Sequence, residues 1–289
     1  MKPPAFDYVA AASTEEVLAE LAAHGDEARI LAGGQSLMPI LNMRLAAPAR
    51  LVDVNRVAAL SYIVERAGGV AIGAMTRQRT AERSGLIATN VPLLAEALPW
   101  VGHTAIRTRG TIGGSLAHAD PAAELPGVAV CLDARVTVRG GGGERTLAAR
   151  EFFRDYLTTA LAPTELLTEV WFPSMPPGSG TAWVEFARRH GDYALVGVAA
   201  VVTLEGSTVR EARLAVIGVD GVPVRAFEAE RLLISAPLST ESMAAAAESL
   251  RRTLAPHNDL HATAAYRRHL AGVLAVRALT RAAERARRP

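Results

Sequence analysis

Two short segments of the chain place adjacent glycines beside hydroxyl and amide side chains. They are Ala32-Gly33-Gly34-Gln35-Ser36 and Thr111-Ile112-Gly113-Gly114-Ser115. Glycine has no Cβ and accepts positive φ, so backbone N–H groups in such a loop can approach a phosphate closely and form a concave anion site. Further donors are available from the side chains of Gln35, Ser36, Thr111 and Ser115. Two such loops could share one diphosphate.

Neither loop carries the residues of the commoner nucleotide-binding motifs. No Walker lysine stands beside either loop, and neither fits the six-residue dinucleotide fingerprint. A Rossmann or ATP-binding interpretation is therefore disfavoured. Because a single Gly-Gly pair is more often an ordinary turn, only the pairing of the loops and their surroundings favour a phosphate site.

The composition excludes several other classes of protein. A net charge of +2 provides no broad field for nucleic acid. The one cysteine, Cys131, cannot by itself hold an iron–sulfur cluster, a disulfide or a cysteine zinc site, and it lies in an apolar run that predicts a buried thiol. No metal-ligand spacing and no Ser-His-Asp arrangement is evident. The N-terminus has no hydrophobic leader and no apolar run has membrane-spanning length, so the cytoplasm is the expected location.

Capping signals and hydrophobic periodicity predict the elements that position the loops. Ser13 to Glu16 predicts a helix start, Gly25 its end, and Thr76 is expected to cap a helix from Arg77. The stretch 91–101 is expected to be helical, and the Pro- and Gly-rich stretch 173–180 to be a linker. Strands are expected at 29–32, 51–54, 69–74, 135–139, 144–147, 194–204 and 209–219, and further helices at 240–254 and 262–287.

Longer stretches around both loops resemble the FAD-binding medium subunit of the molybdenum hydroxylases. These enzymes include aerobic carbon monoxide dehydrogenase, xanthine dehydrogenase and several bacterial N-heterocycle and acyl-CoA dehydrogenases. The resemblance covers residues 31–39, 42–45, 51–54, 106–121, 191–196 and 266–274, in matching order and spacing over nearly the whole chain. The segment Ile106–Pro121 is the longest and most specific of these.

The resemblance implies an α+β fold in three parts. A two-subdomain FAD-binding domain of the vanillyl-alcohol-oxidase (PCMH) type would comprise residues 1–56 and 57–175. A C-terminal α+β flavoprotein domain with an antiparallel sheet and helices would comprise residues 181–289. Each subdomain would contribute one glycine loop, with the FAD diphosphate between them.

The resemblance also implies which residues contact FAD. Glu124 matches an acidic residue, commonly aspartate, that hydrogen-bonds toward the cofactor, and its extra methylene could shift that contact or route it through water. Tyr193 matches a position close to the isoalloxazine, where a ring could cover one flavin face and govern access of an oxidant. The expected cofactor-binding residues are Ile30, Leu31, Ala32, Gly33, Gly34, Gln35, Ser36, Leu37, Val101, Thr111, Ile112, Gly113, Gly114, Ser115, Glu124, Leu167 and Tyr193. No catalytic acid or base and no metal ligand is expected in this chain.

Four polar residues keep open assignments. Xanthine dehydrogenases bring a lysine to the flavin beyond the position of Leu167, and this chain offers only Arg188 and Arg189 there. An arginine at that place would stabilise the anionic reduced flavin, whereas a solvated or interface surface is the alternative. His103 and His118 bracket the second loop and either contact a phosphate or ribose oxygen or are structural.

Taken together, the resemblance implies an oxidoreductase subunit whose cofactor is FAD. Substrate would be oxidised at a molybdopterin-binding large subunit, and electrons would cross two [2Fe–2S] clusters of a small subunit to the FAD. Reoxidation would be by a quinone, NAD⁺ or another carrier, in a heterotrimer paired into a heterohexamer. A stand-alone FAD oxidase or reductase of the same fold and a non-redox binding module are the alternatives. The sequence specifies neither the substrate nor the final acceptor.

Overall fold

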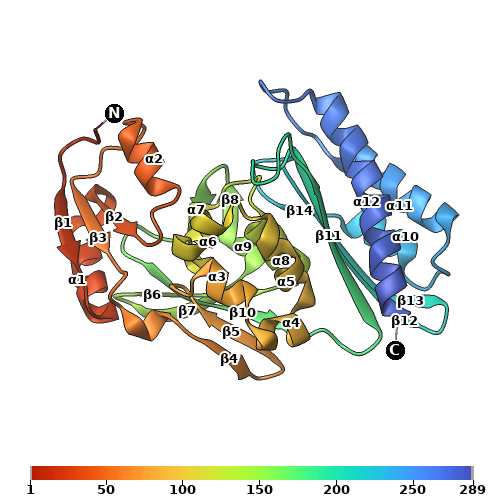
Figure 1. Ribbon diagram of the computed structural model, residues 1–289, viewed down its shortest axis with the longest axis horizontal. Helices are drawn as coiled ribbons and strands as arrows, with labels where there is room; N and C mark the ends of the chain where they lie inside the picture. Colours follow the sequence, from red (N-terminus) through yellow and green to blue (C-terminus); the bar gives the residue numbers. More distant parts are fainter. Residues whose placement is uncertain (1, 288–289) are drawn as a thin grey trace.

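The computed structural model describes residues 2–287, which form three main sheets in succession along the molecule (Figure 1). A small parallel sheet lies at one end, a five-stranded antiparallel sheet in the middle, and a four-stranded antiparallel sheet at the other end. The strands of the three sheets lie within residues 7–53, 63–173 and 179–225. The arrangement places the two glycine loops on neighbouring parts of the chain.

The first part is a three-stranded parallel sheet in the order β1-β3-β2, with β1 at Asp7–Ala10, β2 at Ala28–Leu31 and β3 at Arg50–Asp53. Helix α1 (Thr14–His24) begins at Ser13, whose side chain accepts the Glu16 N–H at 3.2 Å. It ends at Gly25, where φ is +49°. A 3-10 turn η1 (Gly25–Glu27) leads into β2, and the first glycine loop connects β2 to α2 (Leu37–Asn42). The predicted α1, β2 and β3 are thus present.

The second part is a five-stranded antiparallel sheet in the order β4-β5-β10-β6-β7. Short helices from the long connection between β5 and β6 form its apolar core with the sheet. The strands are β4 (Ile63–Arg66), β5 (Gly69–Gly73), β6 (Arg135–Gly140), β7 (Gly143–Ala148) and β10 (Leu166–Pro173), with a hairpin of β8 (Phe153–Asp155) and β9 (Thr158–Thr159). The helices are η2 (Ala58–Leu60), α3 (Gln78–Glu82), α4 (Gly85–Asn90), α5 (Pro92–Ala97), η3 (Leu98–Trp100), α6 (Thr104–Arg109), α7 (Ile112–His118), α8 (Glu124–Cys131) and α9 (Ala149–Phe152).

Two local predictions for this part are wrong. Thr76 does not cap a helix, because its hydroxyl bonds both the carbonyl oxygen (2.9 Å) and the N–H (3.2 Å) of Tyr62. Arg77 is the N-cap of α3 and its side chain makes no capping bond. The second miss is β10, the central strand of the sheet, which pairs with both β5 and β6. Its burial does alternate, with Val170 and Phe172 buried, but the partly exposed position between them is the apolar Trp171, so the alternation is hidden in the sequence.

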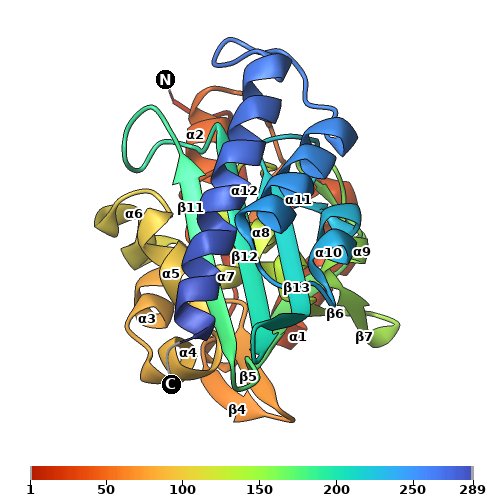
Figure 2. The ribbon, with the colours of Figure 1, turned by 90° about the vertical axis from the view of Figure 1, so that its right-hand side faces the viewer.

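The C-terminal part is an antiparallel sheet of β11 (Ser179–Phe186), β12 (Val196–Glu205), β13 (Thr208–Ile217) and β14 (Val224–Arg225). Helices α10 (Phe227–Leu233), α11 (Thr240–Thr253) and α12 (Ala264–Ala286) cover its outer face, and α12 crosses β11 and β12 (Figure 2). Gly180 permits this close packing, since a Cβ there would lie 1.9 Å from the carbonyl oxygen of Ala282. The predicted linker is shorter than expected, because only residues 174–178 separate β10 from β11.

The inner face of this C-terminal sheet packs on α8 and α5 of the second part. A Cβ at Gly127 would lie 2.5 Å from Cγ2 of Ile217, and Trp183 shares the apolar core of the second part. Cys131 is fully buried at this junction, and burial raises the pKa of its thiol to about 12. The junction is therefore a continuous apolar core, with an inert thiol as predicted.

Candidate functional site

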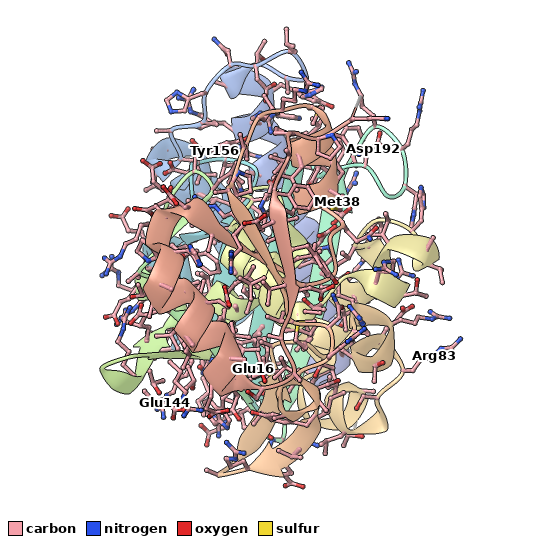
Figure 3. The ribbon with its side chains drawn as sticks, turned by 90° about the vertical axis from the view of Figure 1, so that its left-hand side faces the viewer. Glu16, Met38, Arg83, Glu144, Tyr156 and Asp192 are labelled. Atoms are coloured by element: carbon pink, nitrogen blue, oxygen red, sulfur yellow. The ribbon has the colours of Figure 1, made fainter. Side chains whose placement is uncertain are left out.

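A cavity of about 780 Å³ lies where the three parts of the chain meet. This volume falls within the range of small-molecule and cofactor sites. Its walls include both glycine loops, the 157–167 stretch and the tip of the β11–β12 loop at 191–193. In the view of Figure 3, Met38, Tyr156 and Asp192, which come from three different segments, all lie in the upper half of the molecule.

The first glycine loop presents a run of unpaired backbone donors to this cavity. Within residues 2–287, the N–H groups from 33 to 37 donate to no protein acceptor. The loop is held by other bonds, from Gln35 Nε2 to the Gly33 oxygen (3.0 Å) and from the Met38 N–H to the Gly34 oxygen (3.1 Å). Gly34 turns the chain with φ at +72°, a conformation that favours glycine. Consecutive free N–H groups of this kind suit an anionic group such as a phosphate.

The second glycine loop uses nearly all of its backbone donors within the protein. The Ile112 N–H bonds the Thr76 oxygen (3.0 Å) and the Gly113 N–H bonds the Ala74 oxygen (2.8 Å). The Gly114 N–H bonds the Thr111 hydroxyl (3.0 Å), which caps α7. Over 111–115 in this structure only the Thr111 N–H has no protein acceptor, and the Ser115 hydroxyl adds a side-chain donor. The expectation that both loops offer rows of free N–H groups therefore describes the first loop alone.

The two loops touch each other directly. A Cβ at Gly33 would lie 2.3 Å from the carbonyl oxygen of Arg109 and 2.8 Å from Cα of Gly110. Arg77 stabilises this contact, because its guanidinium donates to the Arg109 carbonyl oxygen (2.5 Å) and to Oδ1 of Asn55 (2.7 Å). Asn55 in turn donates to the Ala32 oxygen at 2.8 Å. Gly33 is therefore required for the approach of the two subdomains as well as for the shape of its own loop.

Glu124 faces the cavity from the first position of α8 and is 6% exposed. Its burial, with the nearby Glu185 and Asp120 carboxylates adding to the effect, raises the pKa of Glu124 to about 8. Glu185 accepts a hydrogen bond from Nε1 of Trp183 at 2.9 Å, yet burial still raises its pKa to about 7. Near neutral pH the Glu124 carboxyl is therefore largely protonated, so it can donate as well as accept a hydrogen bond.

Three further predicted residues line the same cavity. Leu167 is buried on β10, and Val101 follows η3. Tyr193 is 59% exposed because its ring borders the open cavity, although protein surrounds it on its other sides. Burial on those sides is the main cause of a raised pKa for the Tyr193 hydroxyl, and the Asp120 carboxylate adds to it. The nearby Ser36 hydroxyl opposes the shift. Tyr193 thus lies close to the first glycine loop.

Two predicted site residues, Leu31 and Ile112, do not line the cavity. Its neighbours Ile30 and Ala32 do line the cavity, but Leu31 itself does not. Ile112 is fully buried with Leu116 in the core of the second part. The remaining predicted residues line the cavity: Ile30, Ala32, Gly33, Gly34, Gln35, Ser36, Leu37, Val101, Thr111, Gly113, Gly114, Ser115, Glu124, Leu167 and Tyr193.

The residues with open assignments separate in the structure. Arg188 and Arg189 are exposed and do not line the cavity. His118 does line it, and burial lowers its pKa, against the opposing effect of Asp120. His103 lies outside the cavity wall, with its ring against Gly191.

Sequence reasoning missed the stretch 157–163, of which every residue but Ala160 lines the cavity, and the pair Asp26 and Arg29, which line it too. No local pattern marks them. The stretch 157–163 follows the turn of the β8–β9 hairpin and reaches the cavity through the fold of the whole second part. Leu157 has φ at +51°, which only the structure shows.

Comparison with known proteins decides the family. Residues 4–175 match the family described as the FAD binding domain in molybdopterin dehydrogenase. Residues 181–282 match the CO dehydrogenase flavoprotein C-terminal domain. The chain belongs to this family of FAD-binding subunits.

Its relatives are similar over their full length. The chain is 47% identical to subunit alpha of the 6-hydroxypseudooxynicotine dehydrogenase complex of Paenarthrobacter nicotinovorans, over 99% of this chain and 97% of the relative. The carbon monoxide dehydrogenase structure from Hydrogenophaga pseudoflava matches with a TM-score of 0.97 and 36% identity, covering 99% of both chains. Quinoline 2-oxidoreductase from Pseudomonas putida 86 matches with a TM-score of 0.95 and 38% identity, covering 99% of both chains.

These matches confirm the predicted fold class, the FAD cofactor and the oxidoreductase assignment of this flavoprotein subunit. The structure agrees with FAD on its own grounds, because a cavity of cofactor size meets five consecutive free N–H groups. Over the part of the chain that the structure describes, no helix is long and apolar enough to cross a membrane.

Proposed function

We propose that the FAD bound by this subunit receives electrons from [2Fe–2S] clusters of a partner subunit and passes them to an external acceptor. FAD supplies the chemistry for this role, because it exchanges electrons singly or in pairs. The single observation that carries the proposal is a complete FAD cavity in a chain that has one, buried, cysteine. Such a chain holds the flavin and depends on other chains for the clusters.

The cavity residues support specific roles in holding the cofactor. The free N–H groups of 33–37 would bind the diphosphate, with the Thr111 N–H and the Ser115 hydroxyl on the opposite side. Glu124 would give or accept a hydrogen bond, since its carboxyl is largely neutral near pH 7. Leu167, Val101 and Tyr193 would contact the flavin ring system. The domain boundaries 1–56, 57–175 and 181–289 and the cytoplasmic location stay predictions.

The relatives support a division of labour among chains. One is a subunit of a dehydrogenase complex, and the Hydrogenophaga enzyme was solved in a form that lacks the Mo-pyranopterin moiety of its molybdenum cofactor. The relatives act on 6-hydroxypseudooxynicotine, carbon monoxide and quinoline. Subunits this similar serve substrates with little in common, so we infer that a molybdopterin-binding large subunit selects the substrate. A [2Fe–2S] small subunit would complete the unit, paired into a heterohexamer.

The proposal is tested by purifying this chain, tagged, from its own host. We expect one FAD per chain, two co-purifying proteins with iron and molybdenum, and bleaching of the flavin absorbance when the substrate of the complex is added. A quinone or NAD⁺ should then restore the absorbance. Steady turnover of a small organic substrate by the isolated chain would instead show a stand-alone enzyme. Failure of the chain to take up added FAD would refute the proposal and favour a non-redox binding module.

A further inference from the structure

The β11–β12 loop, residues 187–195, places Gly191, Asp192 and Tyr193 on the cavity wall. Its base is firmly fixed. The Leu195 N–H bonds the Phe186 oxygen at 2.8 Å, and Arg267 on α12 donates to the Leu195 oxygen. The tip has no comparable support from backbone bonds, since only the Asp192 N–H bonds within the loop, to the Arg189 oxygen at 3.1 Å.

Aromatic stacking supports the tip. The His190 ring lies 5.5 Å from the Trp100 ring at an interplanar angle of 23°, and 6.2 Å from the His103 ring at 19°. These centroid distances are those of interacting aromatic pairs. The loop backbone also lies against His103, because a Cβ at Gly191 would be 2.5 Å from Cε1 of that ring. Gly191 has φ at +89°, so a glycine is needed there on both counts.

The stacking partners belong to a segment that also lines the cavity. Trp100 ends η3 and His103 is the N-cap of α6, while the two residues between them, Val101 and Gly102, line the cavity. The stack therefore joins the second part of the chain to a loop of the C-terminal part, beside the opening that Tyr193 borders. His103 and His190 are both exposed, so the stack contributes little to the buried core.

We propose that Trp100, His103 and His190 are positioning residues that hold Tyr193 across the cavity opening and so limit the access of oxidants to the FAD. The effect on oxidant access rests on the proposed function, because it requires a bound FAD. The holding of Tyr193 by the stack rests on the loop geometry alone. The two links can be tested separately.

The first test needs no cofactor. Hydrogen exchange of the loop amides is measured in the FAD-free full-length chain. Because aromatic pairs of this kind are modest interactions, His103→Ala and His190→Ala should each raise exchange of the Asp192 amide, the hydrogen-bonded amide of the tip, by about three- to tenfold. His103→Phe keeps a stacking ring and should restore slow exchange. Arg188→Ala, on the same loop but outside the stack, is the matched control and should change nothing. Unchanged exchange in both histidine variants, with circular dichroism confirming the fold, would show that the stack does not hold the loop.

The second test measures access to the flavin. FAD-loaded chain is reduced with dithionite and mixed with benzoquinone in a stopped-flow instrument. His103→Ala and Tyr193→Ala should each speed reoxidation by about two- to tenfold, and the double variant should be no faster than Tyr193→Ala. Additive effects, or a His103→Ala rate equal to that of the wild type, would show that the stack does not act through Tyr193. A chain that binds no FAD would refute the proposed function. The exchange experiment would still show whether the stack holds the loop.

Discussion

The two glycine loops share a Gly-Gly pair followed by a polar residue, yet their backbones serve different purposes. From 33 to 37 the N–H groups of the first loop lack protein acceptors. In the second loop, Ala74, Thr76 and the Thr111 hydroxyl take the N–H groups of 112–114. The first loop is thus a donor surface, and the second is a scaffold that seats α7 against β5 and the neighbouring loop.

The same contrast extends to the glycines themselves. Gly34 is needed for its left-handed backbone. Gly33, Gly113 and Gly114 are needed because another part of the protein lies where a Cβ would be. A Cβ at Gly33 would first meet Arg109, and one at Gly114 would first meet Thr111. Replacing Gly33 or Gly114 would therefore impair FAD binding by disturbing the fold of the site.

The largest expected effect is at the contact between the loops. Gly33→Val would push Cβ into the backbone of Arg109, which cannot move aside as a flexible side chain could. We expect loss of retained FAD and a fall of about 3 kcal/mol in the free energy of unfolding. Flavin absorbance after gel filtration and urea unfolding measure the two. Gly142→Val, where nothing lies within 4 Å of a Cβ, is the control. Full flavin occupancy in Gly33→Val would contradict the contact.

The next effect tests whether the Glu124 carboxyl, which lines the cavity beyond the second loop, is uncharged. The ordinary pKa of a glutamate is 4.5, and Glu124 is raised to about 8 in the folded chain. Between these values the folded state binds more protons than the unfolded state, so stability falls as pH rises, at up to about 1.4 kcal/mol per pH unit for this carboxyl. Urea unfolding of the FAD-free protein from pH 5 to 8 should show this slope. Glu124→Gln should reduce this slope and leave the part that Glu185, whose pKa is raised to about 7, contributes below neutral pH. An equal slope in the variant would show that Glu124 is ionised.

The third effect separates scaffold from donor surface. In Gly113→Ala the new Cβ would lie 2.5 Å from Cβ and 2.8 Å from the oxygen of Ala74. We expect a loss of about 1–3 kcal/mol in stability, with flavin affinity falling only as the folded fraction falls. Thermal unfolding and FAD titration of the same samples decide this. A variant of normal stability that no longer binds FAD would assign the second loop a donor role as well.

The smallest effect concerns the helix cap. Thr111→Val removes the oxygen that accepts the Gly114 N–H at 3.0 Å. Loss of such a cap costs about 1 kcal/mol, so we expect a small fall in unfolding temperature and a loss of FAD affinity of less than about tenfold. Thr111→Ser keeps the hydroxyl and should behave as the wild type. A Thr111→Val variant as stable as the wild type would show that the cap is unimportant.

Much of this protein was determined locally and could be read from the sequence. The helix start at Ser13, the strands on either side of the first loop and the long strands β12 and β13 each follow from a few adjacent residues. The two loops and the segment 106–121 were sufficient to identify the family and FAD. In each case the information lies in residues that are neighbours along the chain, because capping, turns and periodicity act over a few positions.

Only the tertiary structure decided how those residues are used. Whether the N–H groups of 112 and 113 are free depends on Ala74 and Thr76, more than thirty positions away. The neutral state of Glu124 depends on burial beside Glu185, which comes from the C-terminal part. The exclusion of Ile112 from the cavity, the inclusion of 157–163 and the stack on His190 have the same origin. Donor availability, charge and access are set by which distant atoms come into contact, and the spacing of glycines along the chain does not contain that information.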